Sequence, residues 1–277
     1  MSKIVVWMVG LVIGVSLSAS SAWAGGLYLY ENGNPDLGLA AAGRAALAQE
    51  ASTVVGNPAG MTRLDQSQLT TSVYTVAMSA QFNRSGGTTT GGGNGFNAGA
   101  PIPSSSSVSL PFPAGSLFYV YSLSPDLKLG VGAFSGYGAG MNYGKEWVGR
   151  YSLQKIQVLS ATLNPGIAYR VNEWLSVGAG FSVNYGLLSE TVAVNNLAER
   201  LGDGRLKFKA DDWGFGGNAG VLLEPSSRLR FGLTYRSQVD MSYTDQIKFT
   251  NVGPGLQRAL ERGGVMGGEA TLDQTMP

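Results

Sequence analysis

A two-residue alternation of apolar with small polar side chains is the feature that most limits what this chain can fold into. In residues 174–189, WLSVGAGFSVNYGLLS, apolar side chains at odd-numbered positions alternate with Gly, Ser and Asn. Such side chains project to opposite faces of a β-strand, whereas an amphipathic helix repeats every 3.6 residues. The same rhythm recurs in residues 66–82, 115–123, 127–137, 159–169, 213–223 and 228–236. We therefore expect an all-β chain of seven strands, with an eighth strand beginning near Gly268.

The connections between these segments are alternately short and long. The tight turns are residues 124–126, 171–173 and 224–228, and the long connections are residues 83–113, 138–151, 195–206 and 250–267. Transmembrane β-barrels have this layout, with short periplasmic turns and longer outer loops. A soluble β-sandwich is the alternative, but its solvent face usually carries Lys, Glu and Thr rather than Gly, Ser and Asn. The pattern favours an antiparallel transmembrane β-barrel whose wall is formed by residues 65–277.

The first 24 residues have the three regions of a secretory signal peptide. Lys3 supplies the positive start, residues 4–17 are an apolar run, and Ala22-Trp23-Ala24 is a small-residue cleavage site. A transmembrane anchor is the alternative, but a spanning helix needs about 20 apolar residues. We therefore expect residues 1–24 to be a signal peptide.

Charge and residue usage exclude several classes of function. The chain contains no histidine and no cysteine, and it has a net charge of +1 with 13% charged residues. Ser-His-Asp and Cys-His catalysis and metal sites built on His or Cys are therefore excluded. A nearly neutral chain also offers no basic field for nucleic acid. We expect no enzyme, metal, cofactor or nucleic-acid partner, and an outer-membrane enzyme that uses carboxylates stays open as an alternative.

Residues 36–53 differ from the rest because they are rich in alanine and lack the alternation. Asp36 is a candidate N-cap for a short helix, and Gly38 and Gly43 make a long helix unfavourable. A nonrepetitive segment of small residues that precedes a barrel wall can fill the lumen. We therefore expect residues 25–64 to form an N-terminal plug.

Four arginines on the polar face of the strands are candidates for holding an anionic ligand, namely Arg170, Arg228, Arg230 and Arg236. Inside a barrel, an arginine beside apolar surface pairs with a carboxylate more strongly than it does in water. We expect Arg170 and Arg228 to lie at turns in contact with solvent or lipid headgroups. Arg236, farther along its strand, is predicted to face the lumen and to capture ligand or anchor the plug.

Four sequence blocks match one known family in the order in which the family carries them. They are PDLGLAAAGRAALAQEASTVVGNPAGM (residues 35–61), EWVGRY (146–151), LNPGIAYRVNEWLSVGAG (163–180) and DWGFGGNAGVLLEPSSRLRFGLTYRS (212–237). Together they resemble the outer-membrane long-chain fatty acid transporter family, the FadL type, over essentially the whole mature chain. The first block is similar to that family's N-terminal hatch, in which an Asn-Pro-Ala turn precedes the first strand.

The resemblance implies a monomeric barrel of roughly fourteen strands, plugged by a hatch, in the outer membrane of a Gram-negative bacterium. Members of this family pass hydrophobic molecules across that membrane without an energy source of their own. The implied partners are a fatty acid or an aromatic hydrocarbon, together with outer-membrane lipid. Long-chain fatty acids are the leading substrate class, and aromatic hydrocarbons are the alternative within the family. A structural or adhesive surface barrel is the alternative outside it.

The resemblance also assigns functional residues. The mature N-terminus would line the ligand pocket with Gly25, Gly26, Leu27, Tyr28, Leu29 and Tyr30. The hatch would end at a hinge formed by Asn57, Pro58 and Ala59. Ligand would leave sideways through a kink in the third strand, residues 127–140, at Gly130, Gly132, Phe134 and Gly136. Glycines permit such a bend, but they also suit a tight barrel wall, and both interpretations stay open.

The chain is short for a barrel of this kind. Seven strands between residues 66 and 268 use about 29 residues each, so roughly fourteen strands would need nearly twice this length. A membrane sheet with an open edge is not tolerated in lipid. We therefore expect the sequence to end about halfway round the barrel, with closure by two associated chains as the alternative.

Overall fold

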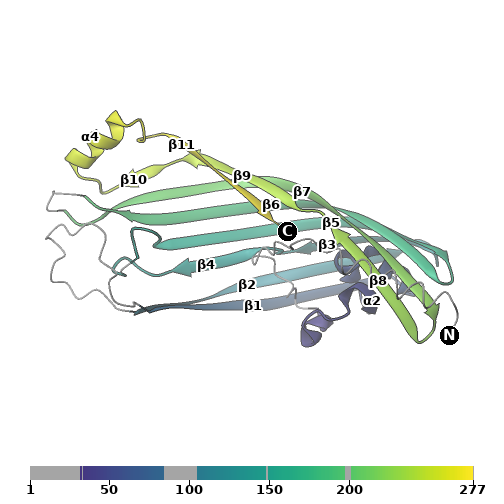
Figure 1. The fold of residues 1–277 in the computed structure, drawn as a ribbon. Coiled ribbons are helices and arrows are strands. Elements are labelled where there is room, and N and C mark those ends of the chain that lie inside the picture. Colours follow the sequence, from purple (N-terminus) through teal and green to yellow (C-terminus); the bar gives the residue numbers. More distant parts are fainter. Residues whose placement is uncertain (1–31, 33, 84–104, 148, 197–200, 277) are drawn as a thin grey trace, which may run out of the picture.

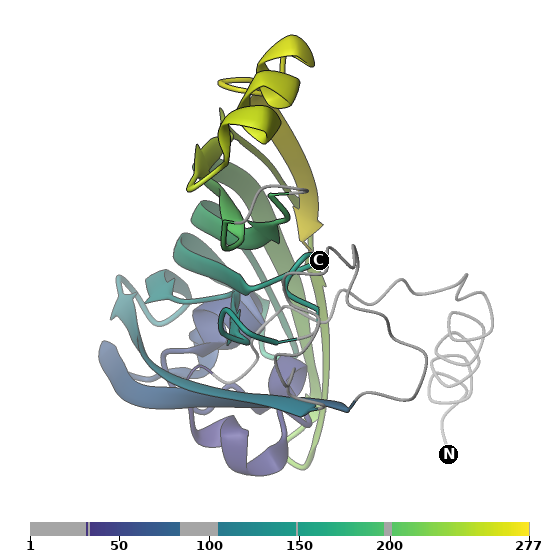
Figure 2. The same cartoon turned by 90° about the vertical axis from the view of Figure 1, so that its left-hand side faces the viewer.

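The computed structural model describes residues 32, 34–83, 105–147, 149–196 and 201–276, so the predicted signal peptide lies outside the described residues. Its wall is a curled antiparallel sheet of nine strands (Figures 1 and 2). These strands are β1 (Gln68–Asn83), β2 (Ser105–Ser122), β3 (Leu127–Phe134), β4 (Gly138–Asn142), β5 (Lys155–Asn172), β6 (Leu175–Val194), β7 (Gly204–Ser226), β8 (Leu229–Arg236) and β10 (Lys248–Thr250). The order is β1-β2-β3-β5-β6-β7-β10, with β4 paired to β5 and β8 paired to β7.

The two faces of the wall have the opposite polarity to those of a soluble protein. On the convex face, Phe181 and Phe215 are 51% and 60% exposed and stack on each other with ring centroids 6.1 Å apart. On the concave face, Asn164 and Asn184 are only 2% and 3% exposed. Successive side chains of a strand face opposite sides, so exposed apolar residues point outward, while the inward face carries polar residues beside the apolar ones that pack on other segments of the chain. This arrangement is typical of a membrane barrel and confirms the predicted fold class over the soluble sandwich.

The strands are longer than the alternation predicts. Residues 105–113 were expected to be loop, but β2 begins at Ser105 and pairs with β1 as far as Asn83. β7 begins at Gly204, inside the predicted connection 195–206. Ser, Pro and Gly have weak intrinsic strand preference, and pairing with a neighbouring strand overrides it.

Residues 237–276 also differ from the prediction. The expected long connection 250–267 contains an amphipathic helix, α4 (Pro254–Arg262). The eighth strand expected near Gly268 corresponds to β11 (Glu269–Met276), which pairs with the unpredicted β9 (Val239–Gln246) in a separate two-stranded sheet. Among the helices of the described residues, none has both the length and the apolar character needed to cross a membrane.

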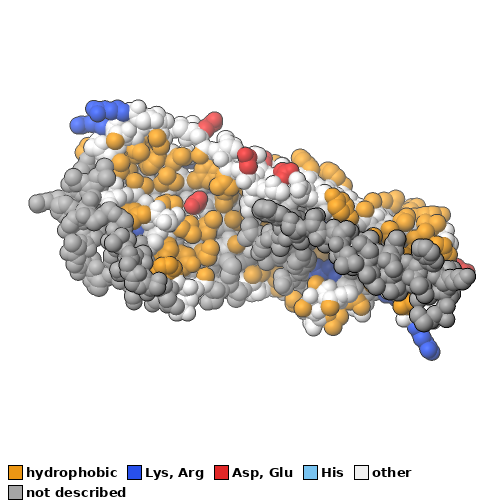
Figure 3. Space-filling view, viewed as in Figure 1, with side chains coloured by type: hydrophobic (Ala, Val, Ile, Leu, Met, Phe, Trp, Pro, Cys, Tyr) orange, Lys and Arg blue, Asp and Glu red, His pale blue; other side chains and the backbone are white. Residues whose placement is uncertain are grey.

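β9 lies against the concave face of the wall, where glycines leave room for it. A Cβ at Gly186 would come within 2.2 Å of the Tyr243 hydroxyl oxygen, and one at Gly214 within 2.4 Å of Val239 Cγ1. Figure 3 shows hydrophobic side chains gathered on this face between α4 and the middle of the sheet. The buried cluster comprises Tyr137, Val158, Leu188, Phe208, Ala210, Val239, Met241, Tyr243 and Met276.

The long connections are fastened to one another through the EWVGRY block. Arg150 is 4% exposed, and its Nε donates to Asp203 Oδ2 over 2.7 Å. The Tyr151 hydroxyl donates to the other Asp203 oxygen over 2.8 Å, and the Arg150 carbonyl accepts from the Ala193 amide. Burial, together with the Asp203 carboxylate, raises the pKa of Tyr151, so its hydroxyl stays a donor. Asp203, the residue before Gly204 of β7, therefore holds Arg150 and Tyr151 in place.

We predict that Asp203→Ala loosens these connections and leaves the wall intact. Removing the carboxylate leaves the nearly buried Arg150 guanidinium without its ion pair, although Asp203 is 23% exposed and solvent screens part of the loss. Amide hydrogen exchange at Leu153 and Ala193 should rise about tenfold, which corresponds to about 1.4 kcal/mol. Glu173→Ala, an exposed carboxylate at the opposite end of the barrel, is the control. Equal exchange in both variants would contradict the prediction.

Candidate functional site

Residues 34–64, the part of the hatch that the structure describes in continuous sequence, form four short helical turns. They are η1 (Pro35–Leu39), α2 (Arg44–Leu47), α3 (Thr53–Gly56) and η2 (Pro58–Arg63). The turns lie against the wall near its short-turn end (Figure 1). Val54 and Met61 are completely buried there, among Phe118, Val120 and Ala168 of the wall.

The Asn57-Pro58-Ala59 turn is the most firmly held part of the hatch. Asn57 is completely buried, and its side-chain nitrogen donates to the Ala45 carbonyl over 2.6 Å and to the Val221 carbonyl over 3.1 Å. Its side-chain oxygen accepts from the Ala59 amide and caps η2, whose first residue is Pro58. Asn57 has an extended backbone, as is usual before proline, and Pro58 starts a helical turn.

Glycines on the concave face of the wall form the seat of the hatch. A Cβ at Gly220 would lie 1.9 Å from Asn57 Oδ1, and one at Gly178 would lie 2.5 Å from the Ala59 nitrogen. At Gly232, it would lie 1.9 Å from the Ala45 carbonyl oxygen. Real Cβ atoms do not approach so closely, so only glycine lets the hatch backbone reach the wall at these positions.

Side chains of the wall bind the carbonyl ends of the hatch helices. Arg230 donates to the carbonyls of Ala46 and Leu47 at the end of α2, over 2.8 and 2.9 Å. At α3, Asn218 donates to the Val54 carbonyl over 3.2 Å, and Arg236 donates to the Val55 carbonyl over 3.1 Å.

Arg170 binds η2 in the same way, because it donates to the Thr62 carbonyl. The last carbonyls of a helix have no partner within it, and cations are favoured at that end. The three arginines therefore hold the hatch by its main chain.

Two sequence predictions about charged residues are wrong. Arg170 was expected at a turn in contact with solvent or headgroups, but it binds the hatch, because its side chain lies on the concave face of β5. Asp36 was expected to cap a helix, but no side chain caps η1, and the Asp36 carboxylate pairs with Arg44, with Nη2 and Oδ1 3.1 Å apart. Arg228 is exposed, as expected.

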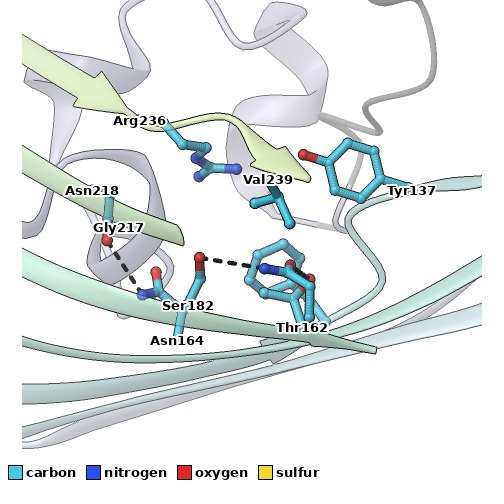
Figure 4. A pocket seen from close by; sticks show the side chains of 10 residues that line it. Tyr137, Thr162, Asn164, Ser182, Gly217, Asn218, Arg236 and Val239 are labelled. Atoms are coloured by element: carbon cyan, nitrogen blue, oxygen red, sulfur yellow. Dashed lines mark hydrogen bonds between the residues drawn. The ribbon is translucent and has the colours of Figure 1, made fainter. Parts of the chain in front are cut away.

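A small cavity of about 20 Å³ lies between the hatch seat and the cluster under β9, with Arg236, Asn164 and Asn218 in its lining (Figure 4). Asn164 donates to the Phe181 carbonyl over 2.8 Å and to Asn218 Oδ1 over 3.2 Å. Thr162 donates to Asn184 Oδ1 over 2.7 Å. The cavity has room for about one water molecule. In this conformation a larger ligand therefore has no space beside Arg236, which donates to the hatch instead.

The wall is interrupted between β3 and β4. Pairing of β2 with β3 stops at Ser116 and Phe134, and in the described residues β4 pairs with β5 alone. Against β5, Phe134 lies opposite Thr162 and Gly138 opposite Leu159, so three residues of the interrupted strand face two of β5. This is a β-bulge, and it leaves the edge of β4 facing β2 without a ladder.

Ser160 stabilises the interruption with its side chain. Its hydroxyl oxygen accepts from the Tyr137 amide over 2.8 Å, and its amide donates to the Tyr137 carbonyl over 3.0 Å. Ser135 donates to the Ser160 carbonyl over 2.8 Å. The Tyr137 amide and carbonyl in the bulge therefore keep hydrogen-bond partners even though the ladder between β2 and β3 stops.

The predicted exit residues separate into two groups. Gly136 lies within the interruption, and Phe134 is the last residue before it, packed on Phe118 with ring centroids 5.9 Å apart. Gly130 and Gly132 lie in regular pairing, and a Cβ on them would come within 2.4 Å of Met61 Sδ and 2.8 Å of Val55 Cγ2. These two glycines therefore make room for the hatch side chains and belong to its seat. The predicted pocket residues 25–30 lie outside the described residues.

Sequence reasoning missed several residues of the seat. Asn164 and Asn218 support or bind the hatch, and Ser160 completes the bulge. Each occupies an even-numbered, concave position of its strand, and this parity was visible in the alternation. The pairing of each residue with a particular carbonyl depends on the hatch conformation. Among the described residues, no three acidic, His or Cys side chains gather closely enough to hold a metal ion.

Comparison with known proteins places this geometry among outer-membrane transporters. The model of the family described as outer membrane protein transport protein (OMPP1/FadL/TodX) matches residues 15–277. The long-chain fatty acid transport protein of Escherichia coli O6:H1 is 27% identical over 272 residues, which cover 90% of this chain and 58% of that protein. Outer membrane protein P1 of Haemophilus influenzae (strain KW20 / Rd) is 28% identical over 294 residues, covering 91% and 62%. The chain thus spans about three fifths of these relatives.

Two solved structures share the fold. A Pseudomonas aeruginosa FadL homologue superposes with a TM-score of 0.72 at 17% identity, covering 90% of this chain and 64% of its own. The Pseudomonas putida toluene transporter TodX superposes with a TM-score of 0.56 at 15% identity, covering 84% and 60%. At these identities the likeness concerns the fold alone.

We predict that Asn57→Ala releases the hatch and leaves the wall folded. The substitution leaves the Ala45 and Val221 carbonyls without their shared donor, which costs about 3 kcal/mol. Amide exchange in residues 53–63 should rise by about a hundredfold, which corresponds to about 2.7 kcal/mol, while exchange in β6 and β7 stays unchanged. Asn142→Ala, at an exposed asparagine whose side-chain oxygen accepts from the Gly144 amide over 3.2 Å, is the control. Unchanged hatch exchange would refute the anchoring role.

We also predict that Gly220→Ala displaces the hatch, because its Cβ would overlap Asn57 Oδ1. Gly217→Ala in the same strand is the matched control, since its Cβ would meet a single backbone oxygen at 3.3 Å. Limited proteolysis should cut residues 40–57 faster in the first variant only. Equal cleavage of the two variants would show that the glycine seat does not position the hatch.

Proposed function

Because the chain belongs to the outer membrane protein transport family (OMPP1/FadL/TodX), we propose that it takes up hydrophobic compounds, long-chain fatty acids foremost. It is an outer-membrane protein of a Gram-negative bacterium, as its relatives are. The names of its sequence relatives, long-chain fatty acid transport proteins among them, support fatty acids. Transport is passive in this proposal, and the complete barrel acts as a monomer.

The interrupted wall beside a filled lumen is the observation that carries this proposal. The hatch blocks straight passage, since its anchors come from β5, β7 and β8 around the concave face. In the part of the wall that the structure describes, no ladder joins β2 to β4. An apolar compound bound in the barrel then leaves sideways into the lipid, past Phe134 and Gly136. Lipid rather than periplasmic water receives the compound, which suits an apolar cargo.

The position of Asn32, the first residue that the structure describes, supports the proposal that residues 25–30 contact the ligand. The Asn32 carbonyl accepts from the Ser116 hydroxyl over 2.6 Å, and Ser116 lies opposite Phe134, the last residue before the interruption. The chain therefore enters the described structure beside the proposed exit. In our proposal, residues 25–30 contact the transported compound, Arg236 anchors the hatch, and Asn57, Pro58 and Ala59 move with it.

Deleting Gly136 tests the lateral exit. The deletion removes the extra residue of the bulge and brings β3 and β4 into one register with β5, so that β2 can pair along the whole strand. Uptake of radiolabelled oleate by cells lacking their own transporter should fall at least tenfold, with normal hatch protection. Deletion of Gly202, in an outer connection where a Cβ would meet nothing within 4 Å, is the control.

The outcomes separate the alternatives. Oleate uptake unaffected by the Gly136 deletion would remove the lateral exit. Toluene uptake without oleate uptake would assign the chain to aromatic hydrocarbons, the cargo named for the TodX structure. Absence of both uptakes in a correctly folded barrel would favour a structural or adhesive surface role.

A further inference from the structure

A second cavity, of about 360 Å³, opens at the short-turn end of the wall. It lies between the β2–β3 turn and the end of the hatch, and its lining includes two cations, Lys128 and Arg170, one carboxylate, Asp65, and two turn-end hydroxyls, Ser122 and Ser124. Lys128 is seven residues from the interruption along β3, or about 23 Å. The cavity is therefore separate from the proposed exit.

Lys128 is buried to a degree that is unusual for lysine. Only 1% of it is exposed, and its Nζ donates to the Ser122 hydroxyl, which lies opposite it in β2. An ammonium group has three donors, and lysine is almost never fully buried unless it is paired with an opposite charge. A single neutral hydroxyl leaves most of the desolvation cost of this cation uncompensated.

Arg170 adds a second positive charge to the same surface. Lys128 lies opposite Ala168 in β5, and Arg170 is two residues farther on the same face of that strand. Such diagonal neighbours are about 7 to 8 Å apart, so the two cations repel each other.

No ion pair joins either Lys128 or Arg170 to a carboxylate in the part of the chain that the structure describes. Asp65 and Asp126, the acidic residues near them, are exposed. Elsewhere at the same end, Glu224 pairs with both Arg63 and Arg230, with the Arg230 Nε 3.2 Å from its oxygen. Within the described residues, the cations around Glu224 are paired with it, whereas those of the second cavity have only the unpaired, exposed Asp65 and Asp126 nearby.

We propose that this cavity binds an oxyanion, a carboxylate or a phosphate, between Lys128 Nζ and the Arg170 guanidinium. A guanidinium presents paired donors that match the oxygens of either group, and burial strengthens both contacts. Arg170 also donates to the Thr62 carbonyl. The bound anion therefore connects the wall to the end of the hatch and holds η2 in its seat. The anion comes from one of two sources, free phosphate or the headgroup of a fatty acid, and the second source rests on the proposed function.

Phosphate binding tests the site directly. Inorganic phosphate is titrated into the protein in neutral detergent, and binding is followed by ³¹P NMR. Wild-type protein should bind phosphate, and Lys128→Gln should weaken binding at least tenfold. Ser124→Glu, a change in the exposed turn that places a carboxylate in the lining, should do the same without touching the buried lysine. Arg228→Gln, which removes an exposed turn cation, should bind like wild type. Amide exchange in residues 58–63 should slow with phosphate in wild type and in Arg228→Gln, and should not change in Lys128→Gln or Ser124→Glu.

A competition arm identifies the source. Displacement of phosphate by dodecanoate at least tenfold more readily than by acetate assigns the site to a fatty-acid headgroup, and equal displacement assigns it to a free anion. Phosphate binding that is absent in wild type, or unchanged in both Lys128→Gln and Ser124→Glu, overturns the proposal. These measurements do not depend on uptake, so they separate failure of this site from failure of the transport function.

Discussion

The main-chain carbonyls of the hatch are the groups on which the rest of the structure depends. Helices of four to six residues are far too short to be stable alone, and each ends in carbonyls that have no partner within the helix. Arg230, Asn218, Arg236 and Arg170 supply those partners from the wall. The donors reach the carbonyls because glycines at 178, 220 and 232 remove the side chains that would otherwise hold the hatch away. Hatch conformation and wall sequence are therefore determined together.

The same requirement for partners governs the interruption in the wall. A strand that leaves its ladder inside a membrane exposes amides and carbonyls to a solvent that cannot bind them. Here the extra residue of the bulge confines the loss to one edge, and the Ser160 side chain takes the place of a backbone acceptor. Local hydrogen bonds from Ser135 and Ser160 thus permit a gap in an otherwise continuous sheet.

The sequence was sufficient for the fold class because period-two alternation is a property of each strand by itself. Leu175 to Leu187 alternates clearly, and β6 was found with nearly the right start. Ser105 to Phe112 was missed because its strand character depends on pairing with β1. β9 was missed because only two residues separate it from β8, so no long connection marks where a new strand begins. At the site, Arg236 was predicted from its position along a strand. The role of Arg170 required knowledge of where the Thr62 carbonyl lies, which no local pattern contains.

Because the wall holds the hatch by its main chain, these contacts constrain the sequence of the hatch less than the sequence of the wall. Every residue carries the same carbonyl, so the clamps at Ala46, Leu47, Val54 and Val55 place no demand on the identity of those side chains beyond their volume. Substitutions that keep those volumes can therefore be accepted at these four positions without loosening the attachment of the hatch. The wall, by contrast, requires glycine where the hatch backbone touches it, and it requires long side chains that donate hydrogen bonds around those points. Substitutions are therefore expected to be better tolerated at these four carbonyl-bearing positions than at the wall glycines that contact the hatch.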